Sequence, residues 1–109
     1  MSAKIIGPYK LLDGVSLGAT VNSTGLDVTR LIYASIAVEW SGTPTGTLTI
    51  EVKNGDSPWI ASSFTQSLSG ASGTKMFDFA LLPWEQLRIA YARTSGTGFI
   101  SAHLLAKGW

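Results

Sequence analysis

The stretch that decides the fold is Leu31 to Val52, LIYASIAVEWSGTPTGTLTIEV. It contains two runs, 32–40 and 48–52, in which every second residue is apolar. Successive side chains of a strand point to opposite faces, so each run predicts a strand with one apolar face. The intervening SGTPTG is rich in turn residues and predicts that the two strands form a hairpin.

The rest of the chain repeats this alternation in short segments. Gly, Pro, Asn and Asp clusters separate them, and no stretch has a helical period. The sequence therefore predicts an all-β fold, a single antiparallel β-sandwich of about eight strands with jelly-roll or Greek-key-like connections. The further predicted strands are 9–12, 15–21, 26–28, 61–68, 75–80, 85–93 and 99–107.

One pattern occurs twice in the chain. IAVEW at 36–40, followed by SGTPTG and an alternating apolar run, resembles IAYAR at 89–93, followed by TSGTG and a second alternating run. Both units have the order strand, Gly-rich link, strand. We expect two matched hairpins that lie in opposed layers of the sandwich.

Composition indicates one ordered domain with an unusual surface. The chain has 109 residues, 45% hydrophobic and 14% charged, which excludes disorder and leaves room for one core. Soluble domains carry about 25% charged residues, so Ser, Thr, Gly and Ala replace charge here. Such a surface suits a protein packed against neighbours, or simply a Thr/Ser-rich β-domain. Residues 1–8 are predicted to be an N-terminal arm, or a frayed terminus, and residues 9–109 the sandwich.

Charge and cysteine content exclude several classes. The net charge is +1 and the eight Lys and Arg residues are scattered, so the sequence has no basic run that would bind nucleic acid. There is no cysteine, and stability must come from the core or from assembly. No apolar run approaches the ~20 residues of a membrane span, and no export signal is evident. We expect the protein to be made and left in the cytoplasm.

The sequence contains no catalytic or nucleotide-binding motif, and no cofactor or metal is predicted. His103 is the single histidine, lies mid-strand without a serine elbow, and is expected to be exposed or at an interface. Asn54 and Asp56 could offer oxygens to calcium, but a tight turn accounts for them better. Glu39 and Glu51 could act as paired carboxylates on a glycoside. Cross-strand ion pairs with Lys53 or Arg88 are the favoured interpretation.

The four tryptophans are the most informative side chains. Trp40 has the parity of the core and is predicted to be buried. Trp59 and Trp84 follow prolines at strand ends, where they could stack on sugars, anchor a protein interface, or plug the open ends of the sandwich. Trp109, at the last position, is predicted to be an anchor onto a neighbour or onto the domain's own surface.

The segments VEWSGTPTGTLTIEVKNGDSPW and LRIAYARTSGTGFISAHLLAKG resemble a group of small tailed-bacteriophage virion proteins. The shared pattern is W/F-S/T-G-T-P-x-G-x-L/F-x-V-x-V, a loop ending in Trp, and a late Y-x-R-T-S-G-T-G hairpin. The matching positions are Trp40 to Val52, Trp59, and Tyr91 to Gly98, and the similarity covers roughly residues 31 to 107.

The resemblance implies a non-enzymatic virion component, since some of these proteins are capsid decoration (cement) proteins and others belong to tails. The implied partners are further copies of the chain, in a homo-oligomer such as a trimer, and a major capsid protein. The alternative is a tail or baseplate module that binds host-surface carbohydrate through Trp59, Trp84 or Tyr33. The resemblance and the sequence features together lead us to expect interface contacts from Lys4, Ile5, Ile6, Trp59, Trp84, His103 and Trp109.

Overall fold

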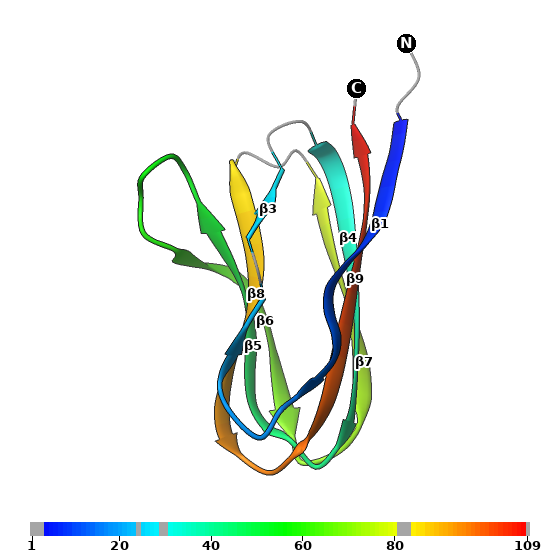
Figure 1. Ribbon diagram of the computed structural model, residues 1–109, viewed down its shortest axis with the longest axis vertical. Coiled ribbons are helices and arrows are strands. Elements are labelled where there is room, and N and C mark those ends of the chain that lie inside the picture. Colours follow the sequence, from blue (N-terminus) through cyan, green and yellow to red (C-terminus); the bar gives the residue numbers. More distant parts are fainter. Residues whose placement is uncertain (1–3, 24, 29–30, 81–83, 109) are drawn as a thin grey trace.

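The computed structural model describes residues 4–23, 25–28, 31–80 and 84–108. All regular structure in these residues is β-strand, and the strands form two antiparallel sheets that face each other (Figure 1). One sheet has the order β1-β9-β4-β7 and the other β2-β8-β5-β6, with β3 also on β8. The predicted β-sandwich is therefore confirmed. The strands are β1 (Lys4–Ser16), β2 (Val21–Asn22), β3 (Leu26–Asp27), β4 (Leu31–Gly42), β5 (Thr45–Lys53), β6 (Ile60–Ser69), β7 (Gly73–Ala80), β8 (Gln86–Ser95) and β9 (Gly98–Gly108).

The connections are those of a jelly roll. β2 and β3 both pair with β8 and act as one interrupted strand, which leaves eight strand positions. The chain then pairs from its ends inward, β1 with β9, β2 and β3 with β8, β4 with β7, and β5 with β6. Pairing of β4 with β9 and of β5 with β8 completes the two sheets. This order is the double Greek key of jelly-roll domains.

The predicted hairpin at 31–52 is wrong. β4 belongs to one sheet and β5 to the other, and the link at Thr43 and Pro44 crosses between them. β8 and β9 are joined across the sheets in the same way, so neither unit of the repeated pattern is a hairpin within one layer. Alternation cannot separate the two arrangements, because in both of them each strand turns one apolar face to the core. Instead, the two units pair with each other, β4 with β9 and β5 with β8.

The two links lie against each other at one end of the sandwich, and this contact explains their shared glycines. The Thr43 N–H donates a hydrogen bond to the Thr97 carbonyl at 2.8 Å. A Cβ at Gly96 would overlap the Thr43 carbonyl oxygen, and one at Gly98 would overlap the Ser41 carbonyl oxygen. Gly96 also has φ of 79°, which glycine adopts without strain. The Gly-rich pattern is thus required by a close backbone crossing.

The core lies between the two sheets and consists of the inward side chains of both. Trp40 is buried as predicted, and its indole N–H donates to the Ala71 carbonyl at 2.9 Å. Tyr91 is also buried, and its hydroxyl donates to the Thr45 carbonyl at 3.1 Å. The buried residues of the central strands are Ala34, Ile36, Val38, Trp40, Leu48, Ile50, Val52, Leu87, Ile89, Tyr91, Ile100, Ala102, Leu104 and Ala106.

The first strand is longer than predicted. A strand was expected only at 9–12, after an arm at 1–8, whereas β1 begins at Lys4 and pairs with the end of β9. Lys4, Ile5 and Ile6 lie opposite Gly108, Lys107 and Ala106. Pairing shifts register between Ile6 and Tyr9, on either side of Gly7 and Pro8, because proline has no N–H to give to the ladder. Residues 1–3 of the predicted arm lie outside the described residues.

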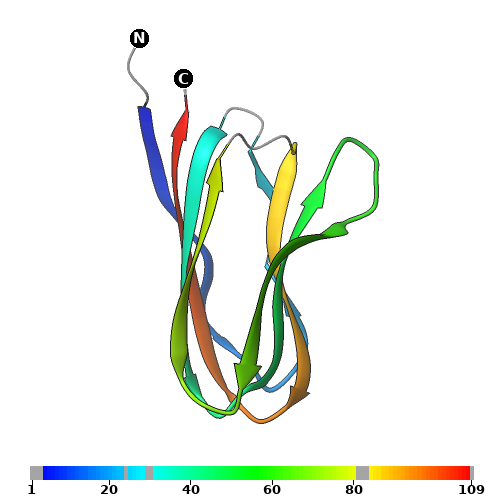
Figure 2. The ribbon, with the colours of Figure 1, turned by 180° about the vertical axis from the view of Figure 1, so that it is seen from behind.

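The β5–β6 hairpin projects from one side of the sandwich (Figures 1 and 2). Its pairing shifts register between Thr49 and Glu51. At this irregularity the Ser62 hydroxyl donates to the Ile50 carbonyl at 2.6 Å and accepts from the Phe64 N–H at 3.2 Å. A bulge of this kind bends the strand, which turns the hairpin tip away from the core.

Candidate functional site

The outward sides of the two sheets differ in character. We call the outward side chains of β4, β7 and β9 the apolar face. It carries Tyr33, Met76, Phe99 and Leu105, which are 48%, 52%, 59% and 42% exposed. These are four of the six exposed large apolar side chains among the described residues; the other two, Tyr9 and Ile60, lie on β1 and at the start of β6. These exposed apolar groups make this face the candidate site for contact with another molecule.

The outward side of the β2-β8-β5-β6 sheet is small and polar, and we call it the threonine face. Most of its outward positions are occupied by Thr, Ser and Ala, with the ion pair of Glu51 and Arg88, and Lys53 lies beside Gln86 at one end. No large apolar residue of this face is exposed among the residues that the structure describes. The residues concerned are Thr45, Thr47, Thr49, Glu51, Thr65, Ser67, Arg88, Ala90 and Ala92.

The register of β4 on β9 places a large side chain beside a small one in the four rows from Ser35 to Ser41. Ser35 lies opposite Leu105, and Ala37 opposite His103. Further along, Glu39 lies opposite Ser101, and Ser41 opposite Phe99. In these four rows the larger side chain is on β9 three times, as Leu105, His103 and Phe99, so this part of the face has a ridge over β9 and a trough over β4.

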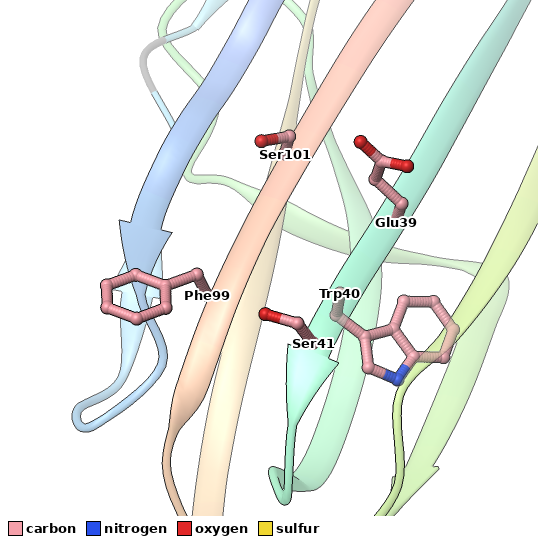
Figure 3. Close-up of a pocket in the computed structure, with 5 residues that line it drawn as sticks. All are labelled: Glu39, Trp40, Ser41, Phe99 and Ser101. Carbon is pink, nitrogen blue, oxygen red and sulfur yellow. The ribbon is translucent and has the colours of Figure 1, made fainter.

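Two shallow grooves lie on this face. Figure 3 shows the first, where Glu39 and Ser41 of β4 lie beside Phe99 and Ser101 of β9, and it holds about 310 Å³. The Ser101 hydroxyl accepts a hydrogen bond from the Gly14 N–H at 2.9 Å. The second groove, of about 290 Å³, lies between His103 and Met76 over Ala37. Both grooves are open and combine an apolar side chain with polar groups, as protein and sugar contacts do.

His103, predicted to be exposed or at an interface, lies on the apolar face. It is opposite Ala37 of β4 on one side and Lys10 of β1 on the other. Lys10 forms an exposed ion pair with Asp13 at 3.7 Å. His103 is partly exposed and borders the second groove, a position in which it can contact a partner.

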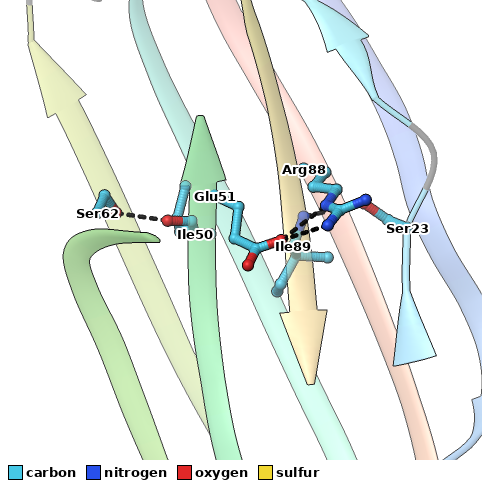
Figure 4. A network of polar contacts seen from close by, with 6 residues as sticks. All are labelled: Ser23, Ile50, Glu51, Ser62, Arg88 and Ile89. Carbon is cyan, nitrogen blue, oxygen red and sulfur yellow. Dashed lines mark hydrogen bonds and ion pairs between the residues drawn. The ribbon is translucent and has the colours of Figure 1, made fainter. Parts of the chain in front are cut away.

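On the threonine face, the predicted cross-strand ion pair of Glu51 is confirmed. The Arg88 guanidinium donates to one Glu51 carboxylate oxygen through Nε and Nη2, both at 2.7 Å (Figure 4). The Trp59 ring lies over this guanidinium at 4.6 Å and near the Lys53 ammonium at 5.8 Å. Trp59 is therefore half-buried in a cation–π stack with its own chain.

Trp84 packs on aromatic side chains that line the core. Its ring meets Phe79 edge-on at 5.9 Å and Phe64 at 6.4 Å, and Phe64 meets Phe79 at 4.6 Å. This is the plugging role that the sequence left open for Trp84. Of the other predicted contacts, Lys4, Ile5 and Ile6 lie on the β1 backbone beside β9, and Trp109 lies outside the described residues.

The described residues do not assemble the side chains that glycoside cleavage or calcium binding would need. Glu39 and Glu51 project from opposite outer faces, so they do not form a pair of carboxylates. The Asn54 side-chain oxygen accepts from the Glu85 N–H at 3.0 Å, and the Glu85 carboxylate accepts from the Gly55 N–H at 2.8 Å. The predicted turn is thus present, with φ of 55° at Gly55.

Two features are absent from the residues that the structure describes. No group of three or more His, Cys, Asp or Glu side chains gathers as metal ligands do. No helix in this part of the chain has the length and hydropathy to cross a membrane.

Sequence reasoning missed most of the apolar face. Phe99, Leu105 and Met76 are not among the interface residues that the sequence predicts. Tyr33 was considered only for sugar binding. The sequence does not show that β4, β7 and β9 are neighbours in one sheet. This neighbourhood places the four exposed residues, which are far apart in the sequence, on one surface.

Comparison with known proteins identifies the fold. No family model and no curated protein sequence matches the chain. The structure of SPBc2 prophage-derived protein YomS matches with a TM-score of 0.66 and 8% identity, over 99% of this chain and 96% of that chain. A chain in the structure of infectious bursal disease virus, Gx strain, matches with a TM-score of 0.55 and 14% identity, over 96% of this chain and 32% of that chain. The chain therefore shares its fold with a prophage-derived protein and with part of a chain from a virus.

Proposed function

We propose that this chain is a non-enzymatic structural protein of a phage virion, a capsid decoration protein that forms a homo-oligomer and stabilises the head shell. The observation that carries the proposal is the apolar face. Tyr33, Met76, Phe99 and Leu105 expose apolar surface on one side of a rigid sheet, and the grooves beside them are open. An open, partly apolar surface suits protein association better than enclosure of a small substrate.

The fold and the composition support the same role. The jelly roll is shared with a prophage-derived protein along nearly the whole chain, and with part of a chain in a virus structure. Only 14% of the residues are charged, which lowers the desolvation cost of covering the surface. On a shell with many equivalent sites, oligomerisation raises the effective concentration of each weak contact, so modest individual interfaces suffice.

The test is to purify particles of the phage that encodes this chain, with and without its gene. We expect the chain in wild-type particles by mass spectrometry, and deletion particles that lose their genome at a lower temperature. Absence of the chain from washed particles would overturn the proposal. So would a deletion phage whose heads resist heat as wild type does while its tails are defective.

One observation favours a second candidate, a tail module that binds host carbohydrate. In the first groove, the exposed Phe99 ring lies beside the Glu39 carboxylate and two hydroxyls, a combination that can stack on and hydrogen-bond a sugar. Trp59 and Trp84, the residues first expected in this role, are engaged by Arg88 and by Phe79. Binding of the wild type to a glycan array, lost in Phe99→Ala but kept in Trp59→Ala, would select this candidate.

A further inference from the structure

We propose that the apolar face is the surface through which two copies of this chain associate, about a two-fold axis that runs along β4 and β9. This deepens the proposed function, because it names the contact between copies. The occupant is a second copy, since the face is complementary to itself in shape and in charge.

Four rows of the apolar face pair a large side chain of one strand with a small side chain of the next. A two-fold axis parallel to the strands and lying between β4 and β9 would place β9 of one copy over β4 of the other, row on row. Leu105 would then lie over Ser35, and His103 over Ala37. In the next rows Glu39 would lie over Ser101 and Phe99 over Ser41, so in these four rows each large side chain meets a small one. Sheets that pack face to face need such interdigitation.

The same rotation places β1 of one copy over β7 of the other. The β1–β9 half of this sheet carries Lys10, which is paired with Asp13, and His103. The β4–β7 half carries Glu39 and Asp78, for which the described residues offer no ion-pair partner. The rotation therefore places Glu39 and Asp78 of each copy over the half that carries Lys10, and not over one another.

The size of the face predicts the strength of the contact. Four strands about 4.8 Å apart, and the span from Tyr33 to Ser41 at about 3.3 Å per residue, give a patch of roughly 600 Å² per copy. This lies at the low end for specific interfaces, which bury about 800 Å² per partner. We expect a reversible dimer with a dissociation constant in the micromolar range, populated at about 100 µM protein.

The first experiment measures self-association by sedimentation equilibrium. Ala37→Lys places a charged side chain at the centre of the face, where it stays solvated in the single chain, and should weaken the dimer at least tenfold. Ala92→Lys makes the same change on a central strand of the threonine face and should leave the dimer unchanged. Leu105→Ser supplies a second test if Ala37→Lys does not fold, and should also weaken it. A monomeric wild type at about 100 µM, or equal effects of Ala37→Lys and Ala92→Lys, would overturn the proposal.

The second experiment tests the axis and exploits the absence of native cysteine. Facing sheets lie about 10 Å apart, so Ser41→Cys and its symmetry mate would lie within reach of a short bis-maleimide. We expect this variant to cross-link and Thr49→Cys, on the threonine face, to remain uncoupled. A dimer in which Ser41→Cys does not cross-link would overturn this axis, because an axis across the strands would carry Ser41 to the opposite end of the partner's face.

Failure of this proposal and failure of the proposed function can be told apart. A monomer that is nevertheless found in purified particles overturns the two-fold contact and leaves the virion role intact. If the chain dimerises and its variants behave as expected, but the chain is absent from particles, the virion role is overturned and the two-fold contact stands.

Discussion

The two outer faces of the sandwich are built on the same jelly roll but use their residues differently. On the threonine face, Glu51 and Arg88 pair with each other, and Trp59 covers the guanidinium. On the apolar face, Phe99 and Met76 are more than half exposed. The charged and aromatic side chains of the first face therefore contact one another, whereas the second face leaves large apolar side chains exposed to solvent.

The largest effect is expected where the two faces are joined. A Cβ at Gly98 would overlap the Ser41 carbonyl oxygen, and neither backbone can yield easily because both are paired in the sheet. Gly98→Ala should therefore lower the free energy of unfolding by at least about 3 kcal/mol. Gly55→Ala is the control, since its Cβ would meet nothing within 4 Å and its φ of 55° costs only about 1 kcal/mol. Denaturant unfolding measures the free energy of unfolding of both variants. Equal losses in the two variants would refute the close backbone crossing at Gly98.

A smaller loss should follow when the threonine face loses its ion pair. Arg88→Ala removes the partner of Glu51, whose side chain is 22% exposed, and the cation beneath Trp59. We expect the free energy of unfolding to fall by about 1–2 kcal/mol. Glu39→Ala removes a carboxylate of the apolar face and should change stability by less than about 0.5 kcal/mol. Similar losses in both variants would remove this distinction between the faces.

On the apolar face, substitutions should alter surface chemistry rather than stability. Phe99→Ser replaces a ring that is 59% exposed, so we expect a change in unfolding free energy within about 0.5 kcal/mol. Binding of a hydrophobic dye should decrease, because the ring is a major part of the exposed apolar surface. Thr49→Ser on the opposite face is the control and should leave dye fluorescence as in the wild type. A large loss of stability in Phe99→Ser would mean that the ring is part of the core.

The smallest effect is confined to alkaline pH and lies beneath the threonine face. Burial raises the pKa of the Tyr91 hydroxyl above its usual value of about 10, and Arg93 opposes part of this rise. The unfolded chain therefore loses this proton first, and the stability contributed by the neutral hydroxyl is present below pH 10 and is lost as pH rises through the folded-state pKa. Tyr91→Phe should flatten that decline in thermal melts. Tyr33→Phe, on the apolar face, should leave the decline as it is.

Local sequence rules predicted the faces of the strands but not their pairing. Alternation placed Ile36 and Trp40 inward and His103 outward, because side-chain direction depends only on neighbours in the chain. It could not show that the links at 43–44 and 96–97 cross between sheets, since a hairpin and a crossing have the same alternation. The extension of β1 was missed because Gly7 and Pro8 signal a break, whereas the strand absorbs them as an irregularity.

The candidate site was less predictable because it depends on long-range pairing. The Glu51–Arg88 pair was among the expected contacts, since both residues lie on polar sides of alternating runs. Stacking of Trp59 on that pair needs β5 and β8 to be neighbours and the 54–59 loop to fold back. The apolar face needs β4, β7 and β9 to be adjacent, which the sequence pattern does not specify.

The most direct measurement is a cryo-EM reconstruction of the purified phage particle in which this chain is located. The account predicts density for the jelly roll on the head, with Tyr33, Phe99 and Leu105 covered by another chain and the threonine face turned to solvent. A particle that lacks this density, or one in which the apolar face is turned to solvent and the threonine face is covered, would contradict it.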